Sequence, residues 1–140
     1  MDTAPYTGGC ACGALRYALT GAPVEQTHCQ CRDCQRRSGT GHSSWLVFAE
    51  APDKVTTGPV RHWASMGEGG TEKRHAFCPT CGTPVFIAFA AMPGLIAITA
   101  ASLDDPSRFA PRQVTWASAA QGWDALAAGL TVHAKMPMPA

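Results

Sequence analysis

The sequence contains few charged residues and no long apolar run. Charged side chains make up 15% of its 140 residues and the formal net charge is +1, so no overall field exists to attract nucleic acid or an anionic membrane. No apolar run approaches the ~20 residues that a membrane-spanning helix needs. Residues 1–9 also have neither the basic start nor the apolar segment of a secretory signal. We therefore expect a soluble, cytoplasmic protein without a membrane partner or a nucleic-acid partner.

Helix signals are scarce as well. Short apolar runs alternate with turn residues at intervals typical of a small all-β protein. Within residues 10–20, Leu15, Tyr17 and Leu19 fall on one face of a predicted strand, and residues 44–49 are predicted to form a buried strand. Further strands are predicted at 24–28, 60–66, 84–90 and 95–101. Residues 32–38 suit one helical turn or a loop, residues 104–109 resemble the start of a short helical turn, and helical apolar spacing occurs only at 123–130.

All seven cysteines fall into three short clusters, and none stands alone. The spacing is C-x-C at residues 10–12, C-x-C-x-x-C at residues 29–34 and C-x-x-C at residues 78–81. An odd number of thiols in these spacings, in a reducing cytosol, fits metal ligands better than disulfides. A redox-active C-x-x-C pair is the alternative, but the surrounding sequence lacks the βαβ pattern of that motif. The clusters therefore predict metal binding.

The first and last clusters together supply a complete ligand set for a structural metal. Structural zinc sites commonly take four ligands at tetrahedral corners from two short-spaced pairs. Gly13 follows the first pair and Gly82 the last, and glycine permits the positive φ that such tight turns need. The four cysteines are Cys10, Cys12, Cys78 and Cys81.

The middle cluster provides three ligands, Cys29, Cys31 and Cys34. Three protein ligands with one exchangeable position are the pattern of a catalytic zinc site. A histidine, either His42 or His75, could instead close the site and make it structural. The sequence does not fix which clusters share a metal, so the opposite pairing of clusters also stays open.

An open site with three thiolates has a distinctive chemistry. Three thiolates on a divalent ion leave a net charge of −1, which makes a weaker Lewis acid than three neutral imidazoles and a poor generator of hydroxide. Such an ion still holds an incoming thiol well, because coordination deprotonates the thiol. We therefore expect the substrate to be a small thiol or a thiol adduct rather than a peptide bond or a phosphate ester.

Basic side chains surround the middle cluster. Arg32, Arg36 and Arg37 lie within it or just beyond it and offset its negative charge. Guanidinium groups bind carboxylates in a bidentate manner, so one or two of them could hold an anionic tail of the thiol. The alternative is a solvated basic turn. No side chain is an evident general acid, and His42 and His75 are the candidates for that role.

Three stretches carry the cysteines: GCACGALRY at residues 9–17, HCQCRDCQRRSG at residues 28–39 and FCPTCGTP at residues 77–84. Together they resemble the glutathione-dependent formaldehyde-activating family, which shares its domain with centromere protein V. The motifs occur in the family's order, and all seven ligand positions match.

The resemblance implies a small single all-β domain of twisted antiparallel sheets, stapled by zinc, of the fold named after a zinc-binding accessory factor of Rab GTPases. It places that domain at residues 6–124, with residues 125–140 as an extension whose tail we expect to be disordered. It also implies two zinc ions per chain. The structural zinc would lie on Cys10, Cys12, Cys78 and Cys81, and the catalytic zinc on Cys29, Cys31 and Cys34.

The activity implied by the resemblance is that of a carbon–sulfur lyase, which in the other direction condenses glutathione with formaldehyde to S-(hydroxymethyl)glutathione. This agrees with the thiol substrate expected from the ligand set. Two other functions stay open. A non-catalytic zinc- or thiol-binding module would bind glutathione without accelerating a reaction. A protein-interaction domain of the centromere-protein kind would use a different partner, although the lack of a basic stripe argues against nucleic acid.

Overall fold

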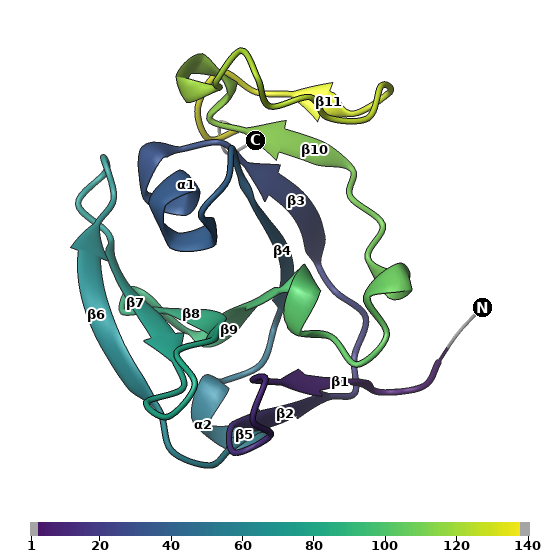
Figure 1. The fold of residues 1–140 in the computed structure, drawn as a ribbon, viewed down its shortest axis with the longest axis vertical. Coiled ribbons are helices and arrows are strands. Elements are labelled where there is room, and N and C mark those ends of the chain that lie inside the picture. Colours follow the sequence, from purple (N-terminus) through teal and green to yellow (C-terminus); the bar gives the residue numbers. More distant parts are fainter. Residues whose placement is uncertain (1–2, 138–140) are drawn as a thin grey trace.

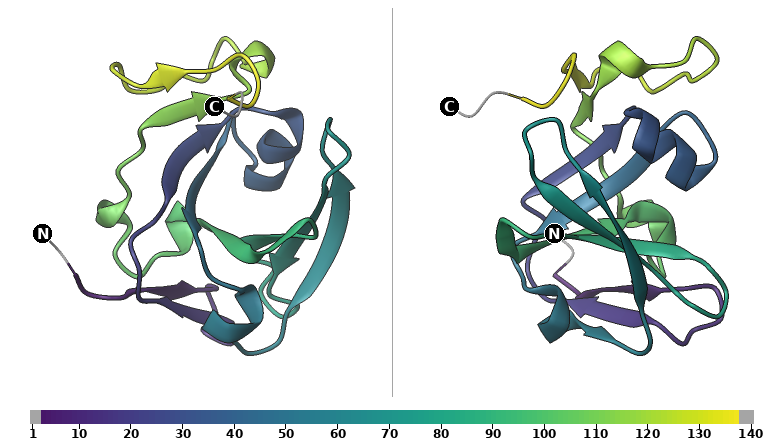
Figure 2. Two further views of the ribbon diagram at one scale, coloured as in Figure 1. Left: turned by 180° about the vertical axis from the view of Figure 1, so that it is seen from behind. Right: turned by 90° about the vertical axis from the view of Figure 1, so that its left-hand side faces the viewer.

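A computed structural model describes residues 3–137 as two β-sheets with several short helices (Figures 1 and 2). The smaller sheet has the strand order β1-β2-β5, and the larger has the order β11-β10-β3-β4-β9-β8-β7-β6. The strands of the smaller sheet are β1 Tyr6–Gly9, β2 Arg16–Leu19 and β5 Thr56–Thr57. Those of the larger sheet are β3 Glu25–Cys29, β4 Ser43–Phe48, β6 Arg61–Met66, β7 Glu72–Phe77, β8 Pro84–Phe89, β9 Met92–Thr99, β10 Gln113–Thr115 and β11 Thr131–Val132. The predicted all-β fold class is confirmed.

The helices are all short. The α-helices are α1 Arg32–Ser38 and α2 Pro52–Val55, and the 3₁₀ turns are η1 Ala100–Ser102, η2 Pro106–Arg108 and η3 Ala117–Ala119. The helical turns predicted at 32–38 and 104–109 are therefore present. The helical spacing at 123–130 was misleading, because that segment forms turns and extended chain with Trp123 exposed. No helix within residues 3–137 is long and apolar enough to cross a membrane.

The larger sheet is antiparallel except at one edge, where β10 pairs in parallel with both β3 and β11. The chain after β9 runs along the molecule through η1 and η2 before it reaches β10 (Figure 1). Residues near the C-terminus are thereby brought beside β3, and the backbone N–H of His133 donates to the carbonyl of Val114 (2.8 Å). The domain boundary at residue 124 stays a prediction, and residues 138–140 of the predicted disordered tail lie outside the described part.

The main core lies between the two sheets. Leu15, Tyr17 and Leu19 have exposed fractions of 1%, 3% and 0%, as their alternation predicted. They pack with side chains on one face of the larger sheet, among them Phe48 and Ile98. The β2 strand begins only at Arg16, because residues 10–15 form a turn.

The opposite face of the larger sheet carries a smaller apolar cluster. Four neighbouring strands each contribute one side chain to a row on this face: His75 (β7), Ile87 (β8), Ala97 (β9) and Val47 (β4). Two of them, Ile87 and Ala97, pack with Trp45 and Cys34. The sheet curves around α1, which covers this face (Figure 1). The middle cysteine cluster is thus placed between α1 and the sheet.

Candidate functional site

Four cysteine sulfurs meet where the turn after β1 lies against the turn between β7 and β8. All four sulfurs lie within 4.8 Å of one another, and two of the separations are 3.6 Å (Cys10 to Cys12) and 3.7 Å (Cys12 to Cys78). We call this group the four-sulfur cluster; its members are Cys10, Cys12, Cys78 and Cys81.

Each half of the four-sulfur cluster is a tight backbone turn closed by a glycine. Gly13 and Gly82 have φ angles of 82° and 76°, as the sequence predicted. The N–H of Gly13 donates to the carbonyl of Cys10, and the N–H of Gly82 donates to the carbonyl of Cys78. Backbone N–H groups also point at the sulfurs, for example Leu15 N–H at Cys10 Sγ (3.3 Å). The two turns are therefore built alike.

The spacing of these sulfurs fits one metal ion. Four sulfurs at tetrahedral corners around an ion, with bonds of about 2.3 Å, stand about 3.8 Å apart. The 3.6 and 3.7 Å separations are close to that value. The cluster can therefore hold a tetrahedral metal without rearrangement.

The other three sulfurs form a second group, which we call the three-sulfur cluster: Cys29, Cys31 and Cys34. Cys29 ends β3, Cys31 is the N-cap of α1 and Cys34 lies in the first turn of that helix. The Cys31 sulfur accepts from the backbone N–H of Cys34 (3.3 Å), while Gly39 ends the helix at a φ of 78°. The C-x-C-x-x-C spacing and the cap thus bring the three sulfurs within 4.8 Å of one another.

The three-sulfur cluster has no fourth ligand among the described residues. No histidine nitrogen or carboxylate oxygen of residues 3–137 joins the group within 4.8 Å. His42 bonds Asp124 through Nδ1, and His75 bonds Ser65 through Nε2 (2.7 Å) and stacks on Trp63. Neither histidine closes the cluster in this structure, so a metal held there would keep one position for an outside ligand.

The three thiols cannot all ionise together without a cation. Hydrogen bonds from the Cys31 and Cys34 thiols lower the pKa of Cys29 to about 3. Donation to Cys29 in turn raises the pKa of Cys31 and that of Cys34. Closely packed thiols of this kind share one negative charge, and a bound cation would allow the others to ionise as well.

The three arginines near this cluster have different surroundings. Arg32 is exposed and bonds the side-chain oxygen of Gln35, and Arg36 is exposed at a small hollow of about 230 Å³. Arg37 is half-buried over the ring of Trp45, and burial lowers its pKa to about 10. No carboxylate of the described chain pairs with Arg37.

The Arg37 guanidinium is only partly satisfied. Its Nη2 donates to the carbonyls of Ala76 (3.0 Å) and Phe86 (3.2 Å), whereas its Nε has no partner among the described residues. A buried cation without an anion is costly unless another negative charge is near. Of the three predicted arginines, Arg37 is therefore the one whose charge is partly buried and lacks a carboxylate partner among the described residues.

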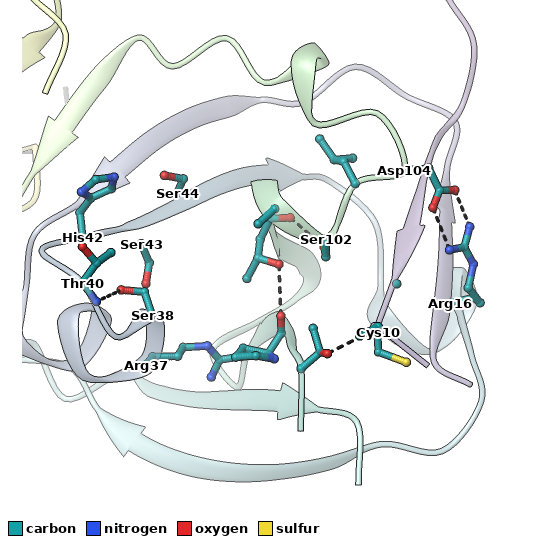
Figure 3. A pocket seen from close by; sticks show the side chains of 17 residues that line it. Cys10, Arg16, Arg37, Ser38, Thr40, His42, Ser43, Ser44, Ser102 and Asp104 are labelled. Atoms are coloured by element: carbon teal, nitrogen blue, oxygen red, sulfur yellow. Dashed lines mark hydrogen bonds and ion pairs between the residues drawn. The ribbon is translucent and has the colours of Figure 1, made fainter. Parts of the chain in front are cut away.

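A cavity of about 700 Å³ lies between α1, the start of β4 and the turn after β9 (Figure 3). It opens there because β9 stops pairing with β4 at the Trp45–Thr99 pair, so Ser43 and Ser44 have no strand on that side. Arg37 and His42 also line it. The volume suits a small-molecule ligand.

The cavity extends from one sulfur cluster toward the other. Cys10 lines it at one end, beside the ion pair of Arg16 and Asp104 (Figure 3). At the other end Ser43 lines it and donates its hydroxyl hydrogen to the carbonyl of Cys34 (2.9 Å). The cavity is therefore lined directly by one cysteine of the four-sulfur cluster, Cys10, and is linked to the three-sulfur cluster through Ser43.

Asp124 is the residue at this site that sequence reasoning missed. Its carboxylate accepts from His42 Nδ1 at 3.0 Å and from Gln30 Nε2 at 3.0 Å, with a side-chain exposure of 7%. It lies 82 residues from His42 along the chain. No local pattern in the sequence could have indicated this contact.

Comparison with known proteins agrees with this architecture. A crystal structure of a Rhodobacter sphaeroides protein is similar over 78% of this chain and 99% of its own, with 21% sequence identity and a TM-score of 0.51, which is a likeness of fold. Residues 5–119 match the family described as glutathione-dependent formaldehyde-activating enzyme, and this range includes both sulfur clusters. The chain belongs to the glutathione-dependent formaldehyde-activating enzyme family.

Proposed function

We propose that this protein is a zinc-dependent carbon–sulfur lyase that joins a small thiol such as glutathione to a small aldehyde such as formaldehyde, or releases the two from their adduct. The observation that carries the proposal is the three-sulfur cluster, which lacks a fourth protein ligand among residues 3–137. Ser43, which lines the cavity, bonds the backbone carbonyl of Cys34 in this cluster. Membership of the family supports the same activity.

Two zinc ions per chain fit the two donor sets. The four-sulfur cluster would hold a structural zinc, because its ligand set is complete. The three-sulfur cluster would hold a catalytic zinc, which keeps the substrate sulfur as a thiolate ready to attack a carbonyl carbon.

The protein side chains would bind and orient the substrate. Arg37 would hold a carboxylate of the thiol, since its guanidinium lines the cavity and lacks an anionic partner. The exposed Arg32 and Arg36 would add positive potential around the cluster without a defined contact. Holding thiol and aldehyde together in the cavity replaces a bimolecular encounter by a reaction within one complex.

The test is to measure zinc content and glutathione binding in the wild type and in Cys31→Ser. We expect two zinc ions per chain to fall to about one, with the fold retained and glutathione binding lost. Asp33→Asn is the control, because Asp33 is an exposed neighbour in the same helix, and it should keep both ions and full binding. One zinc in the wild type, or glutathione binding that survives in Cys31→Ser, would refute the proposal.

A further inference from the structure

The contact between His42 and Asp124 has no part in the proposed function so far. The Asp124 carboxylate only accepts hydrogen bonds when ionised, so Nδ1 of His42 carries the hydrogen between them. No hydrogen bond from residues 3–137 reaches Nε2 of His42, and His42 lines the cavity (Figure 3). The carboxylate therefore fixes the ring in the tautomer whose Nε2 can accept a proton.

The surroundings of Asp124 are built to keep the carboxylate in this position. A Cβ on Gly41 would stand 2.2 Å from Asp124 Cγ, so only glycine leaves room for the carboxylate here. Burial would raise the pKa of Asp124, but the hydrogen bonds from Gln30 and His42 lower it overall. Asp124 lies outside residues 5–119, the range that matches the family. The contact is thus a property of this chain that family membership does not assign.

We propose that His42 is the acid–base residue of the cavity and that Asp124 is its positioning residue. This inference rests on the proposed function. As the substrate thiol becomes a thiolate, its proton passes to Nε2 of His42. An electron pair of the thiolate sulfur then forms the carbon–sulfur bond, and the π electron pair of the carbonyl moves onto the aldehyde oxygen. The Nε2–H of His42 donates its proton to that oxygen. Breakdown of the adduct follows the same transfers in reverse, and neither direction needs another reactant.

Several charged or titratable groups face His42. Asp124 stabilises the protonated ring through direct contact. His28, whose ring centroid is 4.8 Å away, and Arg37, which lines the same cavity, oppose it when they are charged. The Arg16–Asp104 ion pair across the cavity is neutral as a pair. Groups of both signs of charge therefore surround the ring that we assign to proton transfer.

The first test is the rate of adduct formation above the spontaneous rate, with zinc-loaded protein. His42→Gln should lower the turnover number roughly 100-fold with the KM for glutathione and the zinc content unchanged, because a positioned general acid contributes about 10²–10⁴-fold. Asp124→Asn should lower it less and move the acid limb of the pH profile to lower pH. His133→Gln is the control, because the side chain of this distant histidine bonds Gln113 (3.1 Å) and does not line the cavity, and its rate should equal that of the wild type.

The second test counts protons without any turnover. Calorimetric titration of glutathione into zinc-loaded protein, in buffers of different ionisation enthalpy, gives the number of protons released on binding. The wild type should release fewer protons than His42→Gln, by up to about one, because His42 takes up the thiol proton. Equal proton release and an equal rate in the two proteins would overturn the role of His42. A wild type that neither binds glutathione nor accelerates the reaction would overturn the proposed function, and this role with it.

Discussion

The two sulfur clusters use the same ligand atom but differ in number and surroundings. The four-sulfur cluster joins two hairpin turns at the surface, and two of its members, Cys12 and Cys81, are exposed. The three-sulfur cluster lies between α1 and an apolar sheet face that includes Trp45 and Ile87. The cavity is lined by Cys10 of the first cluster and is linked to the second through Ser43, which bonds the backbone carbonyl of Cys34.

The comparison separates a structural role from a chemical one. The four-sulfur cluster ties β1 and β2 to β7 and β8, strands that are distant in sequence, and leaves no place for a further ligand. The three sulfurs of the other cluster come from six consecutive residues, so a metal there would connect little that is not already adjacent. The first cluster should therefore dominate stability and the second should dominate reactivity.

The largest expected effect is the loss of stability when one ligand of the four-sulfur cluster is removed. Cys12→Ser removes an exposed sulfur, so it does not damage the core. We expect a loss of about 5 kcal/mol or more in the free energy of unfolding, because structural zinc contributes roughly 10–16 kcal/mol in small zinc domains. Cys31→Ser should cost far less. Urea unfolding with zinc analysis measures both.

Ala11→Ser is the control for this experiment, since Ala11 is the exposed residue between the two cysteines of the turn. It should keep the stability of the wild type. Equal destabilisation by Cys12→Ser and Cys31→Ser would contradict the division between the two clusters.

The sequence predicted the parts of the molecule that depend on local spacing. The alternation of Leu15, Tyr17 and Leu19 predicted a buried face, and Gly13 and Gly82 predicted the two turns. These features depend on neighbours only a few residues away. The cysteine spacing likewise predicted that the sulfurs within each short stretch, 10–12, 29–34 and 78–81, lie close together, but it left open which stretches share a metal.

The remaining parts depend on contacts between distant residues. β10 is a strand of three residues in parallel pairing, too short for its pattern to be recognised. Asp124 contacts His42, which lies 82 residues away in the sequence. Such long-range contacts override the local helical spacing of residues 123–130, which do not form a helix. Arg36 and Arg37 are adjacent in sequence, yet only the fold shows that one is exposed and the other half-buried.

A smaller expected effect is a pH dependence of stability caused by His75, which lies on the apolar sheet face beside the three-sulfur cluster. Burial lowers the pKa of His75 to about 4, from about 6.5 in the unfolded chain. Between these values the unfolded chain binds more protons, so stability is complete above pH 6.5 and falls as the pH is lowered toward 4. The loss should reach about 3 kcal/mol.

Urea unfolding at pH 7.5, 6.0, 5.0 and 4.0 measures this loss. His75→Gln does not titrate in that range, so its stability should fall less steeply with pH than that of the wild type. Parallel pH profiles for the two proteins would show that the surroundings of His75 are more polar than its 3% exposure implies.

The smallest expected effect concerns glutathione binding near the three-sulfur cluster and compares the adjacent residues Arg37 and Arg36. Arg37→Met should raise the Kd for glutathione about tenfold, or about 1.4 kcal/mol, because a carboxylate contact is lost. Arg36→Met should raise the Kd far less, since exposed Arg36 adds positive potential without a defined contact. Calorimetry with glutathione and with 2-mercaptoethanol, a thiol without a carboxylate, measures these effects.

The two thiols distinguish recognition from support of the fold. Arg37 also bonds the carbonyls of Ala76 and Phe86, and losing those bonds could disturb the cluster itself. A disturbed cluster would weaken the binding of both thiols equally, whereas a lost carboxylate contact would weaken the binding of glutathione alone. If only glutathione binding is weakened, Arg37 contacts the substrate carboxylate. If the binding of both thiols is weakened equally, the role of Arg37 is to support β7 and β8.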